Sequence, residues 1–287
     1  MTKPKIRVGG VPEHFNIPWH NALLDMEANA FPFEIEFVEC SGGTGEMTRA
    51  MKDGQLDLSL LLFEGAVNNI LRGNENRIVK VYVNSPLIWG IHVAARSSIQ
   101  QVDEIRDKVY AISRAGSGSH LIAIVDAAER NWPIDKMKFS KVGNLAGARE
   151  KLANGKVDVF LWEKYTTKPL VDSGEFRRVG QRMVPWPAFV VSVRKKVLDL
   201  YGAEIKRLLQ LVDRHCNQFK SSSDAAEVVS SQFGIQIEDC QNWLDHVEWN
   251  SGFECPENKI FEIAKYLKQI EVVETEDFSI DEVWHSF

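Results

Sequence analysis

The sequence predicts an α/β fold in which two lobes, each built on a mostly parallel sheet, are joined by two hinge strands and enclose a cleft. The chain has 287 residues, more than one hydrophobic core ordinarily supports. Strand-like and helix-like patterns also alternate in the same order twice along it. Two further strand-like segments lie where the chain would pass from one unit to the other and back.

The first unit is predicted to run strand, helix, strand, helix, strand. Runs rich in β-branched residues or alternating in polarity mark its strands, and apolar residues at helical spacing mark its helices. Gly54 stands in a helix-ending position after the second helix. The predicted elements are strand 5–11, helix 18–29 with Met26 on its apolar face, strand 33–40, a helix from Thr44 and strand 56–63.

The second unit repeats this order about one hundred residues later. Gly54 and Asp57 recur as Gly155 and Asp158, each at an offset of 101 and each at a helix–strand junction. The alternative is two independent helix-ending glycines that happen to be followed by turn aspartates. The predicted elements are strand 108–113, helix 119–132, strand 137–142, helix 146–154 and strand 157–162.

Two strand-like segments, 86–94 and 186–193, are predicted to cross between the lobes and to form the hinge. Helical patterns follow Arg194 and are expected to cover the first lobe. The predicted lobe I is therefore 1–90 together with 190–287, and the predicted lobe II is 91–189.

Charge and composition exclude several classes of function. The chain carries 34 Lys and Arg against 40 Asp and Glu, a net charge of -6, and has no basic run for a phosphate backbone, so no nucleic-acid partner is expected. The best candidate for a membrane segment, 56–70, is short and contains Asp57 and Glu64. No membrane segment is therefore expected.

The cysteines predict reduced thiols. Cys40, Cys216, Cys240 and Cys255 have neither CxxC spacing nor a paired pattern, which favours free thiols over disulfides or a metal site. No metal and no cofactor are expected. The start of the chain runs directly into a strand and lacks the apolar core of a secretory signal, which predicts a cytoplasmic protein, or a periplasmic or secreted one if a signal was removed.

Five stretches of the sequence carry a family resemblance: a Gly-Gly turn after the first strand, 51–57, 99–108, 116–120 and 155–165. Together they resemble the type II periplasmic-binding-protein fold, in the NMT1/THI5-like family of nitrate-, sulfonate- and taurine-binding proteins and thiamine-pyrimidine synthases. The resemblance spans nearly the whole chain and implies a protein that binds a small molecule between its lobes. The cysteine-rich motif of the synthases is missing, so the chain is most similar to a cytosolic stand-alone binding protein of fungal type.

Two glycine-rich loops are the leading candidates for ligand contact, because ligands of open α/β sheets lie beyond the carboxyl ends of the strands. The loop of the second unit offers backbone N–H groups, the hydroxyls of Ser117 and Ser119, and His120. The loop of the first unit offers Gly43 and Thr44. The alternative for each loop is an ordinary helix cap with turn glycines.

The loop after the first strand adds Gly10, Glu13 and His14 to the candidates. The alternative for His14 is a solvated loop side chain. Glu64 and Glu163 are predicted to end corresponding strands of the two units. Such carboxylates at a cleft would repel a simple anion and pair with a cationic or amino group.

Four aromatic residues complete the candidate site: Trp89, Trp162, Tyr165 and Trp186. All lie in or beside crossing strands or strand ends, where they could stack on a flat ring. The alternative is that each packs in the core of a lobe. Taken with the glutamates, they predict a planar, partly polar ligand, such as a pyrimidine or a thiamine-related heterocycle with an amino group.

Three functions remain open at this point. The first is a small-molecule binding protein, with no catalytic residue, that closes its lobes on a ligand in the inter-lobe cleft. The second is an enzyme of thiamine-pyrimidine precursor metabolism, with His14, His120 and Glu163 as acid–base groups. The third is a regulatory protein that uses the helical C-terminal part. Nothing in the sequence indicates an oligomeric state.

Overall fold

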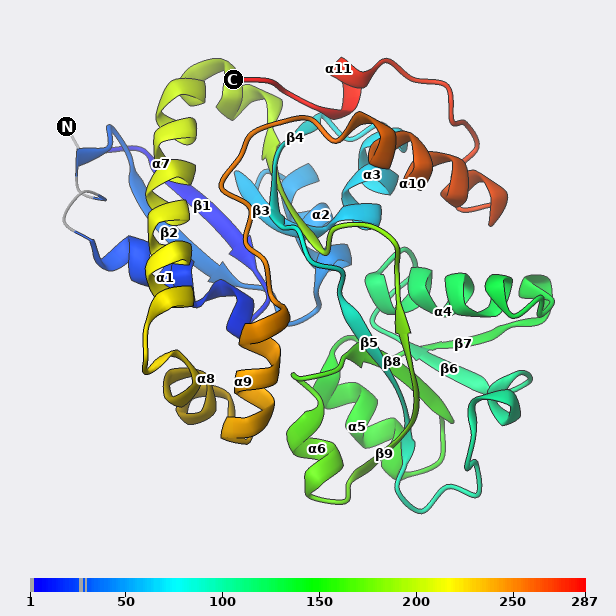
Figure 1. Cartoon of the computed structure of the whole chain (residues 1–287). Coiled ribbons are helices and arrows are strands. Elements are labelled where there is room, and N and C mark those ends of the chain that lie inside the picture. The colour runs from blue at the N-terminus through cyan, green and yellow to red at the C-terminus, as the bar shows by residue number, and fades with distance from the viewer. Residues whose placement is uncertain (1–2, 26–27, 29) are drawn as a thin grey trace.

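The computed structural model describes residues 3–25, 28 and 30–287 and has two lobes side by side (Figure 1). The sheet of lobe I has the strand order β2-β1-β3-β10-β4, and the sheet of lobe II has the order β7-β6-β8-β5-β9. The strands of lobe I are β1 (Lys5–Gly10), β2 (Glu34–Glu39), β3 (Leu58–Leu62), β4 (Asn76–Val83) and β10 (Phe189–Arg194). Those of lobe II are β5 (Ile88–Ala94), β6 (Val109–Ile112), β7 (Lys138–Lys141), β8 (Val159–Glu163) and β9 (Phe176–Met183).

The two sheets are built alike, which confirms the predicted fold class. In lobe I, β1 pairs in parallel with β2 and β3, and β10 pairs antiparallel with β3 and β4. In lobe II, β6 pairs in parallel with β7 and β8, and β5 pairs antiparallel with β8 and β9. Each sheet thus takes its one reversed strand from the segment next to a passage between the lobes.

Helices cover both sheets and extend lobe I toward lobe II. In Figure 1, α10 lies above α4, and α9 lies beside α6. The helices of lobe I are α1 (Ile17–Leu24), α2 (Thr44–Lys52), α3 (Phe63–Leu71), α7 (Lys195–Ser221), α8 (Ala225–Phe233), α9 (Ile237–His246), α10 (Glu257–Gln269) and α11 (Ile280–Val283). Lobe II has α4 (Gly118–Glu129), α5 (Leu145–Ala153) and α6 (Lys168–Asp172). Short 3-10 turns lie at His14–Asn16, Val102–Ile105 and Ile134–Lys136.

The repeated junction has the same role in both lobes. Gly54 and Gly155 have φ values of +71° and +68°, a left-handed conformation that glycine adopts without a steric penalty at the end of a helix. Asp57 then accepts a hydrogen bond from the backbone N–H of Arg7 in β1, at 2.9 Å. Asp158 accepts the equivalent bond from Val109 in β6, also at 2.9 Å. The repeat is therefore structural, and each aspartate ties the start of the third strand to the first.

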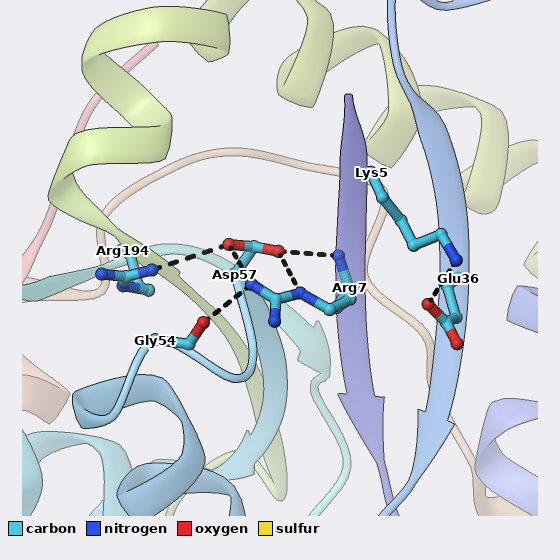
Figure 2. Close-up of polar contacts among 6 residues, drawn as sticks. All are labelled: Lys5, Arg7, Glu36, Gly54, Asp57 and Arg194. Carbon is cyan, nitrogen blue, oxygen red and sulfur yellow. Dashed lines mark hydrogen bonds and ion pairs between the residues drawn. The ribbon is translucent and has the colours of Figure 1, made fainter. Parts of the chain in front are cut away.

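The junction in lobe I carries an additional ion-pair network (Figure 2). The Arg7 guanidinium donates to Asp57 Oδ2 at 3.0 Å and to the Gly54 carbonyl at 2.7 Å. Arg194, at the end of β10, lies 3.7 Å from Asp57 Oδ1. The Asp57 side chain is 9% exposed, so this network joins three neighbouring strands from a largely buried position.

The chain passes between the lobes at 84–87 and 184–188, and neither passage is a strand. The predicted strands 86–94 and 186–193 begin later, at Ile88 and Phe189. Proline explains both delays, because Pro86, Pro185 and Pro187 have no N–H to donate to a strand ladder. The passages lie close to the predicted lobe bounds 1–90, 91–189 and 190–287, which remain a prediction.

The sequence patterns failed where one element follows another without a turn. Glu64 does not end a strand, because the apolar run continues from β3 directly into α3 and places Glu64 in the first turn of that helix. The expected Gly-Gly turn is also wrong, since Gly9 and Gly10 are the last residues of β1. Strands β4 and β9 were missed, and Met26 of the predicted helix 18–29 lies outside the described residues.

Candidate functional site

A cavity lies between the two lobes at the carboxyl ends of strands from both sheets. Its lining includes two carboxyl groups, Glu13 from lobe I and Glu163 from the end of β8. Its volume is about 40 Å³, whereas sites for organic ligands usually have about 300–1,000 Å³. The lobes are therefore closed, and an organic ligand needs them to separate. The lining residues are Val11, Glu13, Gly42, Gly43, Thr44, Leu60, Leu62, Leu87, Trp89, Ser113, Ser117, Gly118, Ser119, Trp162, Glu163 and Phe189.

The two glutamates dominate the electrostatics of this cavity. Both are buried, at 7% and 3% exposure. Burial raises the pKa of Glu13 to about 8, and the neighbouring Glu163 adds to the rise. Burial also raises the pKa of Glu163 to about 7, although hydrogen bonds from Tyr165 and Thr166 oppose the change. A positively charged ligand would favour the ionised form of both carboxyl groups and so oppose these rises in pKa.

The Glu163 carboxylate is fixed by the turn that follows β8. Its Oε2 accepts hydrogen bonds from the backbone N–H of Tyr165 at 2.9 Å and of Thr166 at 2.6 Å, and from the Thr166 hydroxyl at 2.9 Å. His14 Nε2 lies 3.9 Å from the same oxygen. Three donors on one oxygen hold the carboxylate in place at the wall of the cavity.

Hydroxyl groups from both lobes also line the cavity. Thr44 Oγ1, at the start of α2, accepts a hydrogen bond from the N–H of Leu62 at 3.2 Å. Ser119 Oγ, in the first turn of α4, accepts one from the N–H of Ser113 at 3.0 Å and lies 3.1 Å from Ser117 Oγ. These bonds fix the hydroxyl oxygens and place both helix N-termini beside the cavity.

Two buried donors at the cavity have no hydrogen-bond partner within the described part of the chain, namely Trp89 Nε1 and the Ser113 hydroxyl. Buried polar groups are rarely left unpaired, so each is available to a ligand or to water. The second indole, Trp162, stacks on Phe160 at a centroid distance of 5.2 Å. The cavity thus combines two indoles with polar groups at its edges.

Eight of the fourteen predicted site residues line the cavity, which brings together residues from both units. They are Glu13, Gly43, Thr44, Trp89, Ser117, Ser119, Trp162 and Glu163. Whether each of them contacts a ligand remains a prediction.

Two other predicted residues lie behind the cavity wall. His14 is 1% exposed, so the expected alternative of a solvated side chain is wrong, and burial lowers its pKa to about 3. Its ring lies 4.3 Å from that of Trp243, and neither ring nitrogen has a hydrogen bond within the described residues. Tyr165 contributes its backbone N–H to Glu163 rather than its ring to the cavity.

The remaining four predicted residues have other neighbours. At Gly10 a Cβ would lie 2.4 Å from the Phe37 ring, so close packing requires this glycine. Trp186 Nε1 donates to Glu64 Oε2 at 2.9 Å, which ties the passage between the lobes to α3. His120 accepts a hydrogen bond from the N–H of Gly116 and faces a different cavity.

Sequence reasoning missed eight lining residues: Val11, Gly42, Leu60, Leu62, Leu87, Ser113, Gly118 and Phe189. Three of them carried a signal, since Gly42 and Gly118 lie within the two predicted glycine-rich loops and Ser113 shortly precedes one of these loops. The apolar residues carried none, because an apolar strand residue that faces a cleft has the same pattern as one that faces a core.

The described residues contain no cluster of three or more His, Cys, Asp or Glu side chains arranged to hold a metal ion. No helix within the described ranges is long and apolar enough to cross a membrane.

Comparison with known proteins points to one structural group. A family model of Ca3427-like periplasmic binding proteins matches residues 89–182. No curated protein matches the chain significantly. The Candida albicans CA3427 gene product, described as defining a new family with the generic periplasmic-binding-protein fold, superposes with a TM-score of 0.87. It is 26% identical, and the match covers 96% of this chain and 92% of that chain.

Two sulfonate-binding proteins have the same fold at lower identity. The alkanesulfonate-binding protein SsuA from Xanthomonas axonopodis pv. citri, bound to MOPS, has a TM-score of 0.79 and 14% identity, with 99% of each chain covered. The aliphatic sulphonate-binding SsuA from Escherichia coli has a TM-score of 0.71 and 16% identity, covering 99% of this chain and 98% of that one. The present chain therefore has the type II periplasmic-binding-protein fold and is similar in structure to the CA3427 gene product and to the SsuA proteins.

Proposed function

We propose that this chain is a solute-binding protein that closes its two lobes on a small, planar ligand carrying an amino or other cationic group. The ligand would occupy the cavity between Glu13 and Glu163. Proteins of the same fold bind small molecules, as the MOPS complex of the Xanthomonas SsuA protein illustrates. A ligand closes the lobes when it makes more favourable contacts with the closed state than with the open state.

The observation that carries this proposal is the convergence of two buried carboxyl groups and two indoles on one cavity. Glu13 comes from lobe I, whereas Trp89, Trp162 and Glu163 come from lobe II. A flat ring that packs against either indole would gain aromatic contacts, and an amino group on that ring would reach the carboxylates. Closure completes this arrangement, because neither lobe holds all four groups.

The same cavity disfavours the ligand class of the SsuA proteins. Among the described residues that line it, none is Lys or Arg. A sulfonate would be desolvated against two carboxyl groups without a cation to compensate for its charge. We infer that the ligand specificity of this chain differs from that of its sulfonate-binding structural relatives.

A thermal-shift screen tests the proposal, because a ligand raises the melting temperature by binding only the folded state. The compounds are aminopyrimidines of the thiamine pathway, other aminated heterocycles, alkanesulfonates and nitrate. We expect an aminated heterocycle to give the largest rise, and Glu163→Gln to reduce this rise. Glu34→Gln, an exposed carboxyl outside the cleft, is the matched control. A larger rise with alkanesulfonates that survives Glu163→Gln would contradict the proposal.

We also propose a reducing compartment, such as the cytoplasm, as the place of action. All four cysteines are free thiols, and Cys40, Cys216 and Cys240 are buried. Free thiols persist where glutathione and thioredoxin systems operate. Fractionation of cells that produce the chain from its own gene would test this assignment, and recovery from an oxidising compartment would oppose it.

A further inference from the structure

A second cavity between the lobes shares no lining residue with the first. Its volume is about 480 Å³, within the range of sites for small organic molecules. It lies between α2 and α3 of lobe I and the loop that precedes α4 of lobe II. We call it the rear groove. Its lining residues are Gly45, Thr48, Arg49, Lys52, Gly65, Asn68, Asn69, Arg72, Asn74, Arg114, Ala115, Gly116, His120, Ile124, Ile270, Glu271 and Val272.

The rear groove is cationic, although the chain as a whole carries a net charge of -6. Its charged lining residues are Arg49, Lys52, Arg72 and Arg114 against the carboxylate of Glu271. Within the described ranges, none of the four cations forms a salt bridge. Clustered charges of one sign in a concave surface reinforce one another and attract an ion of the opposite sign.

Two of the cations have a local role at helix ends, whereas Arg114 does not. Arg49 lies in the last turn of α2, and Arg72 directly follows α3, where cations offset the partial negative charge of a helix end. Arg114 has no such role, since it follows β6 in the other lobe. Burial lowers the pKa of Arg114, and the nearby Arg49 adds to this lowering while Glu46 opposes it. Arg49 and Arg114 thus approach each other from the two lobes, and Glu46 offsets part of their positive charge.

A buried side chain in the same groove has an unsatisfied polar atom. Asn68, on α3, is 6% exposed, and its Oδ1 has no hydrogen-bond partner among the described residues. Its amide nitrogen lies near the other lobe, 3.7 Å from the position of a Cβ on Gly116. An unpaired buried amide is costly, and a ligand with hydroxyl or amino groups would satisfy it.

We propose that the rear groove is a second binding site, specific for a small phosphate-bearing anion that bridges Arg49 and Arg72 of lobe I and Arg114 of lobe II. Guanidinium groups bind phosphate oxygens in a bidentate manner. Because the anion contacts both lobes, it favours their closed arrangement. The polar amide of Asn68 lies at the inner wall and recognises the organic part of a phosphate ester.

Titration calorimetry at low ionic strength, with inorganic pyrophosphate and with AMP as probes, tests this site. We expect binding of at least one probe. Arg49→Gln combined with Arg72→Gln should weaken it by about tenfold or more, since each lost charge-assisted bond has roughly that effect. Tighter binding of AMP would indicate a phosphate ester as the natural ligand, and tighter binding of pyrophosphate would indicate an inorganic anion. Either result supports the site.

The matched control removes the same amount of charge elsewhere. Arg106→Gln combined with Lys265→Gln replaces two exposed cations outside the groove and should change the affinity by less than about twofold, the size of a screened long-range effect. Glu163→Gln, in the first cavity, should leave probe binding intact. Absence of binding by both probes, an equal loss in the control, or a loss in Glu163→Gln would overturn the proposal.

Discussion

At the scale of single residues, Glu13 makes the stability of the ligand-free protein depend on pH. Its pKa is raised from an ordinary 4.5 to about 8 in the folded chain, so the folded state keeps a proton that the unfolded state releases. The free energy of unfolding therefore falls as the pH rises from about 4.5 to about 8. Glu163 adds a similar fall that ends near pH 7.

Glu13→Gln should flatten this dependence, because glutamine stays neutral throughout. Between pH 5 and pH 8, we expect the unfolding free energy of the variant to fall by on the order of 2 kcal/mol less than that of the wild type. Urea denaturation at several pH values measures the difference. The exposed Glu34→Gln should reproduce the wild-type curve. If the unfolding free energy of Glu13→Gln changed with pH as steeply as that of the wild type, the Glu13 carboxyl of the wild type would be ionised throughout this range.

The sequence could indicate individual site residues but not which of them meet. Glu163 was predicted because it ends a strand of the second unit, and Glu13 because it follows the first strand. Their electrostatic coupling arises only when the lobes close, and no local pattern encodes that contact. The burial of His14 could not be predicted either. It belongs to a predicted loop, yet the rings of Phe15 and Trp243 pack against it.

At the scale of elements, the two junction aspartates provide an internal comparison. Asp57 accepts hydrogen bonds from the backbone N–H and from the guanidinium of Arg7, whereas Asp158 accepts one from the backbone N–H of Val109. We expect Asp57→Ala to lower the unfolding free energy by about 3 kcal/mol and Asp158→Ala by about 1 kcal/mol. Chemical denaturation measures both. Equal losses would mean that the ion pairs of Figure 2 add no stability.

The start of α4 controls the size of the first cavity. A Cβ on Gly118 would lie 2.2 Å from Leu62 Cδ1 of lobe I and 2.9 Å from the Trp89 ring. Gly118→Ala should therefore fill the cavity or keep the lobes apart, and weaken ligand binding by about tenfold, as the loss of a well-packed contact does. Calorimetry with the best compound of the thermal-shift screen measures this loss.

Gly202→Ala is the control, because nothing lies within 4 Å of the added Cβ. It should leave ligand affinity unchanged. Wild-type affinity in Gly118→Ala would place the ligand outside the cavity between Glu13 and Glu163.

The helices and strands could be predicted where turn residues mark their ends. Both β-α-β-α-β units were found because glycines and prolines separate their elements, and the Gly-x-x-Asp repeat revealed their equivalence. The boundary between β3 and α3 was lost because the sequence passes from Leu62 to Phe63 without a turn residue. Strand β4 was missed because Lys80 interrupts its apolar pattern, although this lysine is buried against Asp213 at 3.1 Å.

At the scale of the whole molecule, contacts on two sides hold the lobes together. Lys168 of α6 lies 2.9 Å from Asp239 of α9, and the Tyr266 hydroxyl of α10 donates to the Val125 carbonyl of α4 at 3.3 Å. The C-terminal helices of lobe I therefore contact lobe II, as Figure 1 shows. The sequence predicted these helices as a cover for lobe I but gave no indication that they reach the second lobe.

These two polar contacts are partly exposed, so each of them adds little to closure without a ligand. Lys168→Gln should shift the ligand-free protein toward the open state and increase its radius of gyration. The exposed Lys195→Gln, whose partner Asp199 lies in the same helix, should not. Small-angle X-ray scattering distinguishes the two variants, and identical curves would show that the α6–α9 contact does not restrain the lobes.

The most direct test of the two-lobed clamp is small-angle X-ray scattering of the wild-type protein with and without the compound that raises its melting temperature most. Saturation is verified beforehand by calorimetry. Closure on the ligand predicts a smaller radius of gyration with the ligand bound than without it. An unchanged curve at verified saturation would contradict the proposal that ligand binding closes the lobes.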